Sequence, residues 1–161
     1  MGKKNRRNAK NQKGAHKAWG WALVAGALLL FGATVFWPTG NKNMFEADEA
    51  TISQGGQLYA KNCAACHGAQ AEGQFPDKKM GGQLPDGRYI APALNGTAHM
   101  WHHAPDLLFR IVKQGSPAPD SPMVGWKDKM TDDEIGSVLA YLQSIWPEKT
   151  RNQYRKSFMT N

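Results

Sequence analysis

Cysteine is scarce in this chain, and its scarcity concentrates the question of function on one short segment. Cys63 and Cys66 are the only cysteines among 161 residues. They lie in NCAACHGAQ, residues 62–70, two residues apart and with His67 directly after the second. The chain also lacks internal repeats, and its length suits one ordinary domain with an appendage. What this pair of cysteines holds therefore decides most of what the protein can do.

Acidic residues are absent from the first 18 positions, which carry seven lysines and arginines. The formal charge of the chain is +7, whereas residues 38–161 hold 13 basic and 13 acidic side chains. All of the excess positive charge therefore lies in the N-terminal tail. A globular part that is neutral by this count offers no strong field for a polyphosphate, so we expect no nucleic-acid partner.

Charge of either sign is absent from AWGWALVAGALLLFGATVFW, residues 18–37. A helix over residues 19–37 would be about 28 Å long, close to the hydrocarbon thickness of a bilayer. Trp19, Trp21 and Trp37 stand at its ends, where indole rings favour the headgroup region. We therefore predict a transmembrane signal anchor at 19–37, with residues 1–18 as a basic cytoplasmic tail.

The alternative for this run is a cleaved secretory signal, whose apolar region is shorter and ends at small residues. Ala25-Gly26-Ala27 is the one triplet of that kind, and it lies in the middle of the run. A retained anchor is the better interpretation. It would place the rest of the chain in the periplasm, tethered to a bacterial inner membrane by a polar linker over residues 38–50.

Helical patterns bracket the expected domain, residues 51–147. At its start, Thr51 or Ser53 could cap a helix in which Gly55, Tyr59 and Cys63 recur at four-residue spacing. At its end, Thr131 and Glu134 predict a capping box for a helix over 131–146 that stops at Pro147. One apolar stripe marks this last helix: Ile135, Val138, Leu139, Leu142 and Trp146.

The middle of the domain is poor in regular structure. APDLLFRIVKQG, residues 104–115, predicts a third helix, while residues 68–98 and 116–130 are rich in glycine and proline and contain no convincing strand. The fold class is therefore all-α, with three to five short helices and long loops. We expect the two terminal helices to cross, with the glycines of the first under an aromatic ring. So small a core needs a large apolar group or a staple to enclose.

Three chemistries compete for Cys63, Cys66 and His67. A thioredoxin-like CxxC starts a helix after a strand, whereas a helix precedes this motif. A zinc site could be completed by His99 and His103, but these lie far beyond finger spacing and leave His67 unexplained. Attachment of one haem by two thioethers, with the adjacent histidine on the iron, uses all three residues. It also suits the oxidising side of the membrane.

With these motifs, the chain resembles the class I c-type cytochromes in their membrane-anchored single-haem form, over about residues 51–146. Gly55, Tyr59 and Cys63 match the family's glycine, aromatic residue and first cysteine. Tyr141 in VLAYL matches the aromatic residue that meets the N-terminal helix. The resemblance implies a small cytochrome c fold around one covalently attached haem c. It also implies that the carbonyl of Pro92 accepts a hydrogen bond from the ligand histidine.

The same resemblance implies a methionine as the second axial ligand. Met123 in SPMVGW lies 56 residues after His67 and just before the last helix, as the family's distal methionine does. The cluster HMWHH, residues 99–103, offers an alternative, because His99, His102 or His103 could replace Met123 or bind a second metal. Packing on the haem edge or on a partner is the simpler role for this cluster, and packing is also the simpler role for Trp101 and Trp126.

Two filled axial positions leave the iron able to do little but change its oxidation state, so we expect an electron carrier and not an enzyme. Its partners would be redox proteins at or near the membrane, and no small-molecule substrate is expected. Two alternatives are a haem subunit fixed within a larger oxidase or dehydrogenase complex and a haem enzyme or sensor with an open distal site. Residues 148–161 form a basic extension, which could lie on the membrane or a partner, or fray.

Overall fold

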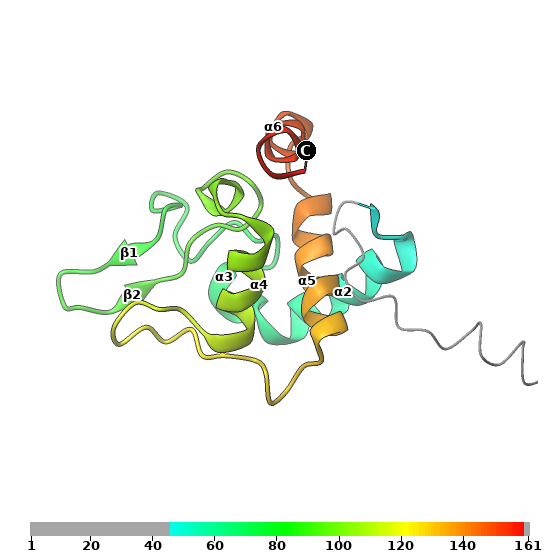
Figure 1. Cartoon of the computed structure of the whole chain (residues 1–161). Helices are drawn as coiled ribbons and strands as arrows, with labels where there is room; N and C mark the ends of the chain where they lie inside the picture. Colours follow the sequence, from blue (N-terminus) through cyan, green and yellow to red (C-terminus); the bar gives the residue numbers. More distant parts are fainter. Residues whose placement is uncertain (1–45, 160–161) are drawn as a thin grey trace, which may run out of the picture. The chain divides into compact units, whose positions relative to one another are not determined.

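The computed structural model describes residues 46–159, which form a mostly helical domain (Figure 1). The tail, the expected membrane anchor and most of the linker, residues 1–45, lie outside the described residues. Within 46–159 no helix is both long enough and apolar enough to cross a bilayer.

The first helix, α2, spans Glu49–Asn62 and begins two residues earlier than the sequence suggested. Its cap is neither Thr51 nor Ser53, so that expectation was wrong. The Asp48 carboxylate accepts a hydrogen bond from the Thr51 backbone N–H at 2.8 Å. An aspartate at this position also places negative charge beside the positive end of the helix.

The last helix of the expected domain, α5, spans Asp132–Ser144 and has the predicted capping box. The Thr131 hydroxyl accepts from the Glu134 N–H at 3.2 Å, and the Glu134 carboxylate accepts from the Thr131 N–H at 2.8 Å. The predicted apolar stripe is buried throughout, at no more than 2% exposure: Ile135, Val138, Leu139, Leu142 and Trp146. These side chains form the centre of the core, together with buried side chains from the other helices and the loops.

The crossing of α2 and α5 explains why glycines occur inside a helix, where they cost about 1 kcal/mol relative to alanine. A side chain at Gly55 would collide with the backbone carbonyl of Ser137 on α5. The Tyr141 ring covers Gly56, and its centroid lies 5.5 Å from that of Tyr59. The predicted crossing, with glycines under an aromatic ring, is confirmed.

Three shorter helical elements lie between these two helices. The α3 helix, Ala64–His67, follows directly from α2, and η2, Met100–His102, is one 3₁₀ turn. The α4 helix, Pro105–Gln114, starts with proline and ends at Gly115, as predicted, and packs on α5. Cys63 joins α2 to α3, and α3 contains Cys66 and His67 of the CxxCH segment.

The expectation that residues 68–98 contain no strand was wrong in detail. Two-residue strands β1, Gly82–Gln83, and β2, Tyr89–Ile90, pair antiparallel with Gly82 opposite Ile90. The resulting hairpin projects from the side of the domain away from α2 (Figure 1). Such short strands leave no periodic signal in the sequence.

The C-terminal segment is also more ordered than a fraying tail, because residues Glu148–Phe158 form helix α6. Tyr154 is fully buried, with its ring centroid 5.2 Å from that of Trp146. An Arg151 guanidinium N–H donates to the Ser144 carbonyl at 2.7 Å, which joins α6 to the end of α5. The idea of a frayed end was wrong for these residues.

Candidate functional site

The CxxCH segment continues the first helix as one further turn. Cys63 donates its backbone N–H to the Tyr59 carbonyl at 2.8 Å, and His67 donates to the Cys63 carbonyl at 3.0 Å. The two cysteines therefore lie one helical turn apart, and a helix precedes the motif, as predicted. Both are free, with Cys63 half-buried and Cys66 exposed.

As a free thiol, Cys63 is poorly suited to disulfide exchange. Burial, and then the nearby Cys66, raise the pKa of the Cys63 thiol to about 11. At neutral pH this thiol is protonated, whereas the thiolate is the form that binds metal or attacks a disulfide. The environment of Cys63 therefore does not favour the thioredoxin-like interpretation.

His67 is held in one ring orientation by a contact with a distant loop. Its Nδ1 lies 2.9 Å from the Pro92 carbonyl oxygen, and the residue is 8% exposed. Because a carbonyl can only accept, Nδ1 carries the proton, and the lone pair of the neutral ring is on Nε2. Burial lowers the pKa of His67, although the hydrogen bond to Pro92 opposes this. The imidazole is thus prepared to bind a metal through Nε2.

Two further contacts fix the chain after His67. The Tyr59 hydroxyl donates to the Gly68 carbonyl at 2.7 Å, and burial raises the pKa of Tyr59, which keeps this donor protonated. Gly73 donates its N–H to the His67 carbonyl at 2.8 Å. Gly68 itself has φ +84°, a value that residues with a side chain rarely adopt. The helix therefore ends directly after the histidine.

Met123 is half-buried and lies on a partly exposed loop that is hydrogen-bonded to the C-terminal end of α4. Its carbonyl accepts from the Ser116 N–H at 3.0 Å, and its neighbour Val124 forms a β-bridge with Gly115. Trp126 donates to the Val112 carbonyl at 3.1 Å. Gly125 allows this approach, because an added Cβ there would lie 2.7 Å from the Lys113 carbonyl oxygen.

The other described methionines within the domain have different surroundings. Met100 and Met130 are each 6% exposed and belong to the core, while Met80 is 60% exposed. Met123 is intermediate, which is the environment expected of a thioether that faces a group in the domain. The exposed fractions of the methionines are therefore compatible with Met123 as the iron ligand, and this assignment remains a prediction.

The histidine cluster forms a compact group on and beside η2. The rings of His99 and His103 lie 5.5 Å apart edge to face, and the Trp101 and His102 rings lie 3.8 Å apart. Over residues 46–159, no three or more His, Cys, Asp or Glu side chains gather in a way that could hold a metal ion. Trp101 and Trp126 are partly buried against the core, as expected of packing residues.

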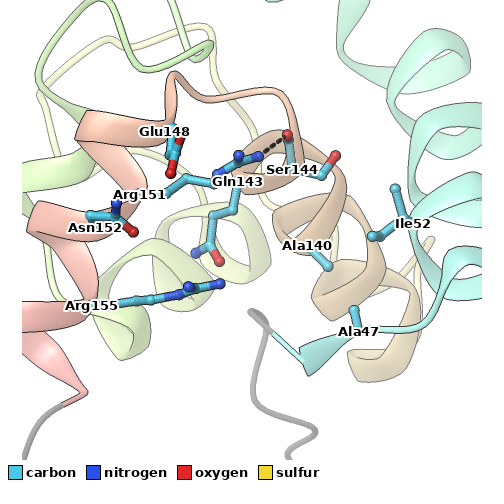
Figure 2. Close-up of a pocket in the computed structure, with 9 residues that line it drawn as sticks. All are labelled: Ala47, Ile52, Ala140, Gln143, Ser144, Glu148, Arg151, Asn152 and Arg155. Atoms are coloured by element: carbon cyan, nitrogen blue, oxygen red, sulfur yellow. Dashed lines mark hydrogen bonds between the residues drawn. The ribbon is translucent and has the colours of Figure 1, made fainter.

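A pocket of about 270 Å³ occurs elsewhere, between the start of α2, the end of α5 and α6 (Figure 2). None of the CxxCH residues, Pro92 or Met123 lines it. Its lining is mixed: α5 contributes apolar Ala140 beside polar Gln143 and Ser144, and the residues from α6 are all polar or charged. This pocket is separate from the candidate site.

The donor set fits a covalently attached haem. Two thiols one helical turn apart can form the two thioethers, and the Nε2 of His67 and the sulfur of Met123 are both common iron ligands. The observation that carries the fit is the Pro92 contact, which leaves Nε2 of a buried imidazole as its free metal-binding atom. Sequence reasoning missed Tyr89, which no motif marked and whose hydroxyl donates to the Pro119 carbonyl in the loop that carries Met123.

The helical frame and the CxxCH segment define a c-type cytochrome domain. The family described as cytochrome c oxidase, cbb3-type, subunit III matches residues 50–142, more than half of the chain, and the chain belongs to this family. Covalent haem c and electron transfer through it follow from that membership. The chain is also similar to cytochrome cL of the marine methylotroph Methylophaga aminisulfidivorans, with 22% identity over 78% of this chain and 84% of that one and a TM-score of 0.49.

Proposed function

We propose that Cys63 and Cys66 attach one haem c, that His67 and Met123 are its axial ligands, and that the protein carries single electrons between redox proteins. The observation that carries this proposal is the 2.9 Å contact between His67 Nδ1 and the Pro92 carbonyl. It fixes the tautomer and orientation of a ring that directly follows the second cysteine. Hydrogen bonds of this kind are characteristic of metal-binding histidines.

The haem would supply a reversible one-electron change at its iron. The role of the chain is to hold both ligands while that change occurs. His67 is fixed by α2 and Pro92, and Met123 by the backbone of α4. If His67 and Met123 both bind the iron, no open coordination site would remain for a substrate, and the protein would act as a carrier and not as an enzyme.

We further propose that residues 19–37 anchor the chain in a bacterial inner membrane, with the haem domain in the periplasm. The uncharged run and the basic tail of the sequence support this orientation. Since α2 starts at Glu49, only 11 residues separate Trp37 from the first helix of the domain. Fully extended, they reach at most about 40 Å. The redox partners should therefore be membrane complexes or proteins close to them.

The ligand assignment is tested by the visible spectrum of the ferric holoprotein. A methionine ligand gives a sulfur-to-iron charge-transfer band, and we expect Met123→Ala to abolish it. Met80→Ala is the matched control, because Met80 is exposed and should leave the band unchanged. High-spin features in the unmodified protein would contradict the assignment and favour a haem enzyme or sensor with an open distal site. The mass of the intact protein shows whether one haem is attached.

A second candidate function is a fixed subunit of a larger oxidase or dehydrogenase complex. The family description favours it, since it names a subunit of a terminal oxidase. Purification in mild detergent separates the two functions. A mobile carrier should elute alone, whereas a fixed subunit should keep stoichiometric partners with haem or copper of their own.

A further inference from the structure

The loop that carries Met123 is held unequally along its length. From Val124 onward, its backbone is bonded to the last turn of α4, with Trp126 and Lys127 both donating to the Lys113 carbonyl at 3.1 Å. Residues 117–122 instead bond mainly to one another and to their immediate sequence neighbours. Ser121 donates its N–H to the Ala118 carbonyl at 3.2 Å, and Met123 donates its N–H to the Ser121 hydroxyl at 3.3 Å. At the tip, Asp120 has φ +58°, a left-handed conformation that is uncommon for residues with a side chain but that aspartate adopts more readily than most. Residues 117–122 are therefore held in place only if another segment of the chain contacts them.

One side chain supplies that support. The Tyr89 hydroxyl donates a hydrogen bond to the Pro119 carbonyl, 30 positions along the chain. Among the hydrogen bonds recorded between residues 46 and 159, it is the one that joins 117–122 to a distant segment. Both residues are near the surface, and the bond replaces contacts with water. Its removal should loosen the tip without disturbing the core.

Tyr89 lies on a segment that is itself held in place by strand pairing and burial. It lies on β2, paired with Gln83 on β1, and the next residue, Ile90, is only 3% exposed. The hairpin turn is closed by the Leu84 N–H, which donates to the Arg88 carbonyl at 2.9 Å, and Arg88 also pairs with Asp86 at 2.8 Å. At the base of the hairpin, Gln74 donates to the Ala91 carbonyl at 3.1 Å. Tyr89 thus projects from an anchored segment and not from a second loose loop.

The same segment also holds the other proposed ligand. Pro92, which accepts the hydrogen bond from His67, lies three residues after Tyr89. Residues 89–92 therefore contact the His67 ring at one end and the Met123 loop at the other. We propose that Tyr89 is a positioning residue, which keeps the Met123 loop closed through Pro119. This inference rests on the proposed function, in which Met123 is an iron ligand.

The test is Tyr89→Phe in the ferric holoprotein, which removes the hydroxyl and keeps the ring. Added imidazole competes with Met123, and its binding rate reports how often the loop opens. We expect this rate to rise about five-fold, the factor that corresponds to one typical hydrogen bond. Backbone amides of residues 117–122 should exchange with solvent faster by a similar factor. Tyr141→Phe is the matched control, because its ring packs on α2, and both rates should stay unchanged.

The outcomes separate this inference from the ligand assignment. If Tyr89→Phe leaves both rates at their original values, the contact does not hold the loop and the inference is wrong. If amide exchange rises but imidazole binding does not, Tyr89 supports the loop without positioning Met123, which also overturns it. If instead Met123→Ala leaves the charge-transfer band intact, the ligand assignment fails, while amide exchange still reports whether Tyr89 restrains residues 117–122.

Discussion

The two sides of the proposed haem site are built differently. Cys63, Cys66 and His67 continue a helix that crosses α5 at close range, and His67 is almost fully buried. Met123 lies on a loop beside Val124, which is 59% exposed. The first side depends on the packing of the domain core. The second depends on a few backbone hydrogen bonds. We therefore expect destabilising substitutions to weaken the binding of Met123 to the iron more readily than the binding of His67.

The largest effect on stability is expected at the crossing of α2 and α5. Gly55→Ala places a methyl group against the Ser137 backbone, which cannot move unless α5 moves with it. We expect a loss of about 3 kcal/mol in the free energy of unfolding, measured by urea denaturation of the holoprotein. Gly136→Ala on α5 is the control, because nothing lies within 4 Å of the added methyl. Its higher helix propensity should stabilise by about 0.5 kcal/mol. Equal effects of the two variants would contradict the close crossing.

The corresponding change on the loop side is Gly125→Ala. An added Cβ would lie 2.6 Å from the Gln114 carbonyl carbon, so the loop must move away from the end of α4. We expect a loss of about 2 kcal/mol and a weaker sulfur-to-iron band in the folded protein. Gly55→Ala should show the reverse, with lower stability and an intact band in the folded fraction. A band that survives in Gly125→Ala would mean that Met123 does not depend on this contact.

A smaller effect is expected at the cap of α5. Thr131→Ala removes the hydroxyl that accepts from the Glu134 N–H and should cost about 1 kcal/mol. Thr51→Ala is the matched control at the start of α2. The cap there is Asp48, and it binds the backbone of Thr51, not its side chain. Urea denaturation should show almost no change for this control. A large loss would show that the Thr51 hydroxyl, as the sequence suggested, supports the helix.

These comparisons also show which features were predictable. The crossing of α2 and α5 follows from glycines and aromatic residues at fixed spacing, and the capping box follows from Thr131 and Glu134, because each is a local pattern. The competition between Asp48 and Thr51 could not be decided from the sequence, since both residues are good caps. The pairing of His67 with Pro92 was inferred from resemblance, and no local pattern predicts it.

The features that the sequence did not reveal depend on contacts between distant residues. Helix α6 has little apolar character of its own, and Tyr154 orders it by packing against Trp146. The bond from Tyr89 to Pro119 joins two loops without periodicity. Neither feature has a motif, because each becomes favourable only after the helices have formed. The loop side of the site is for this reason the less predictable one.

The smallest expected effect concerns the loop histidine His99. Burial, and then the neighbouring His103 and His102, lower the pKa of His99, and its Nδ1 is buried without a hydrogen-bond partner among residues 46–159. Below about pH 6.5 the unfolded chain binds a proton that folded His99 resists, so stability falls as the pH falls. In urea denaturation between pH 7 and 5, His99→Gln should show a shallower decline than the unmodified protein. His102→Gln keeps His99 buried and should alter the decline less. Equal slopes in the unmodified protein and His99→Gln would show that His99 takes up its proton as readily in the folded domain as in the unfolded chain.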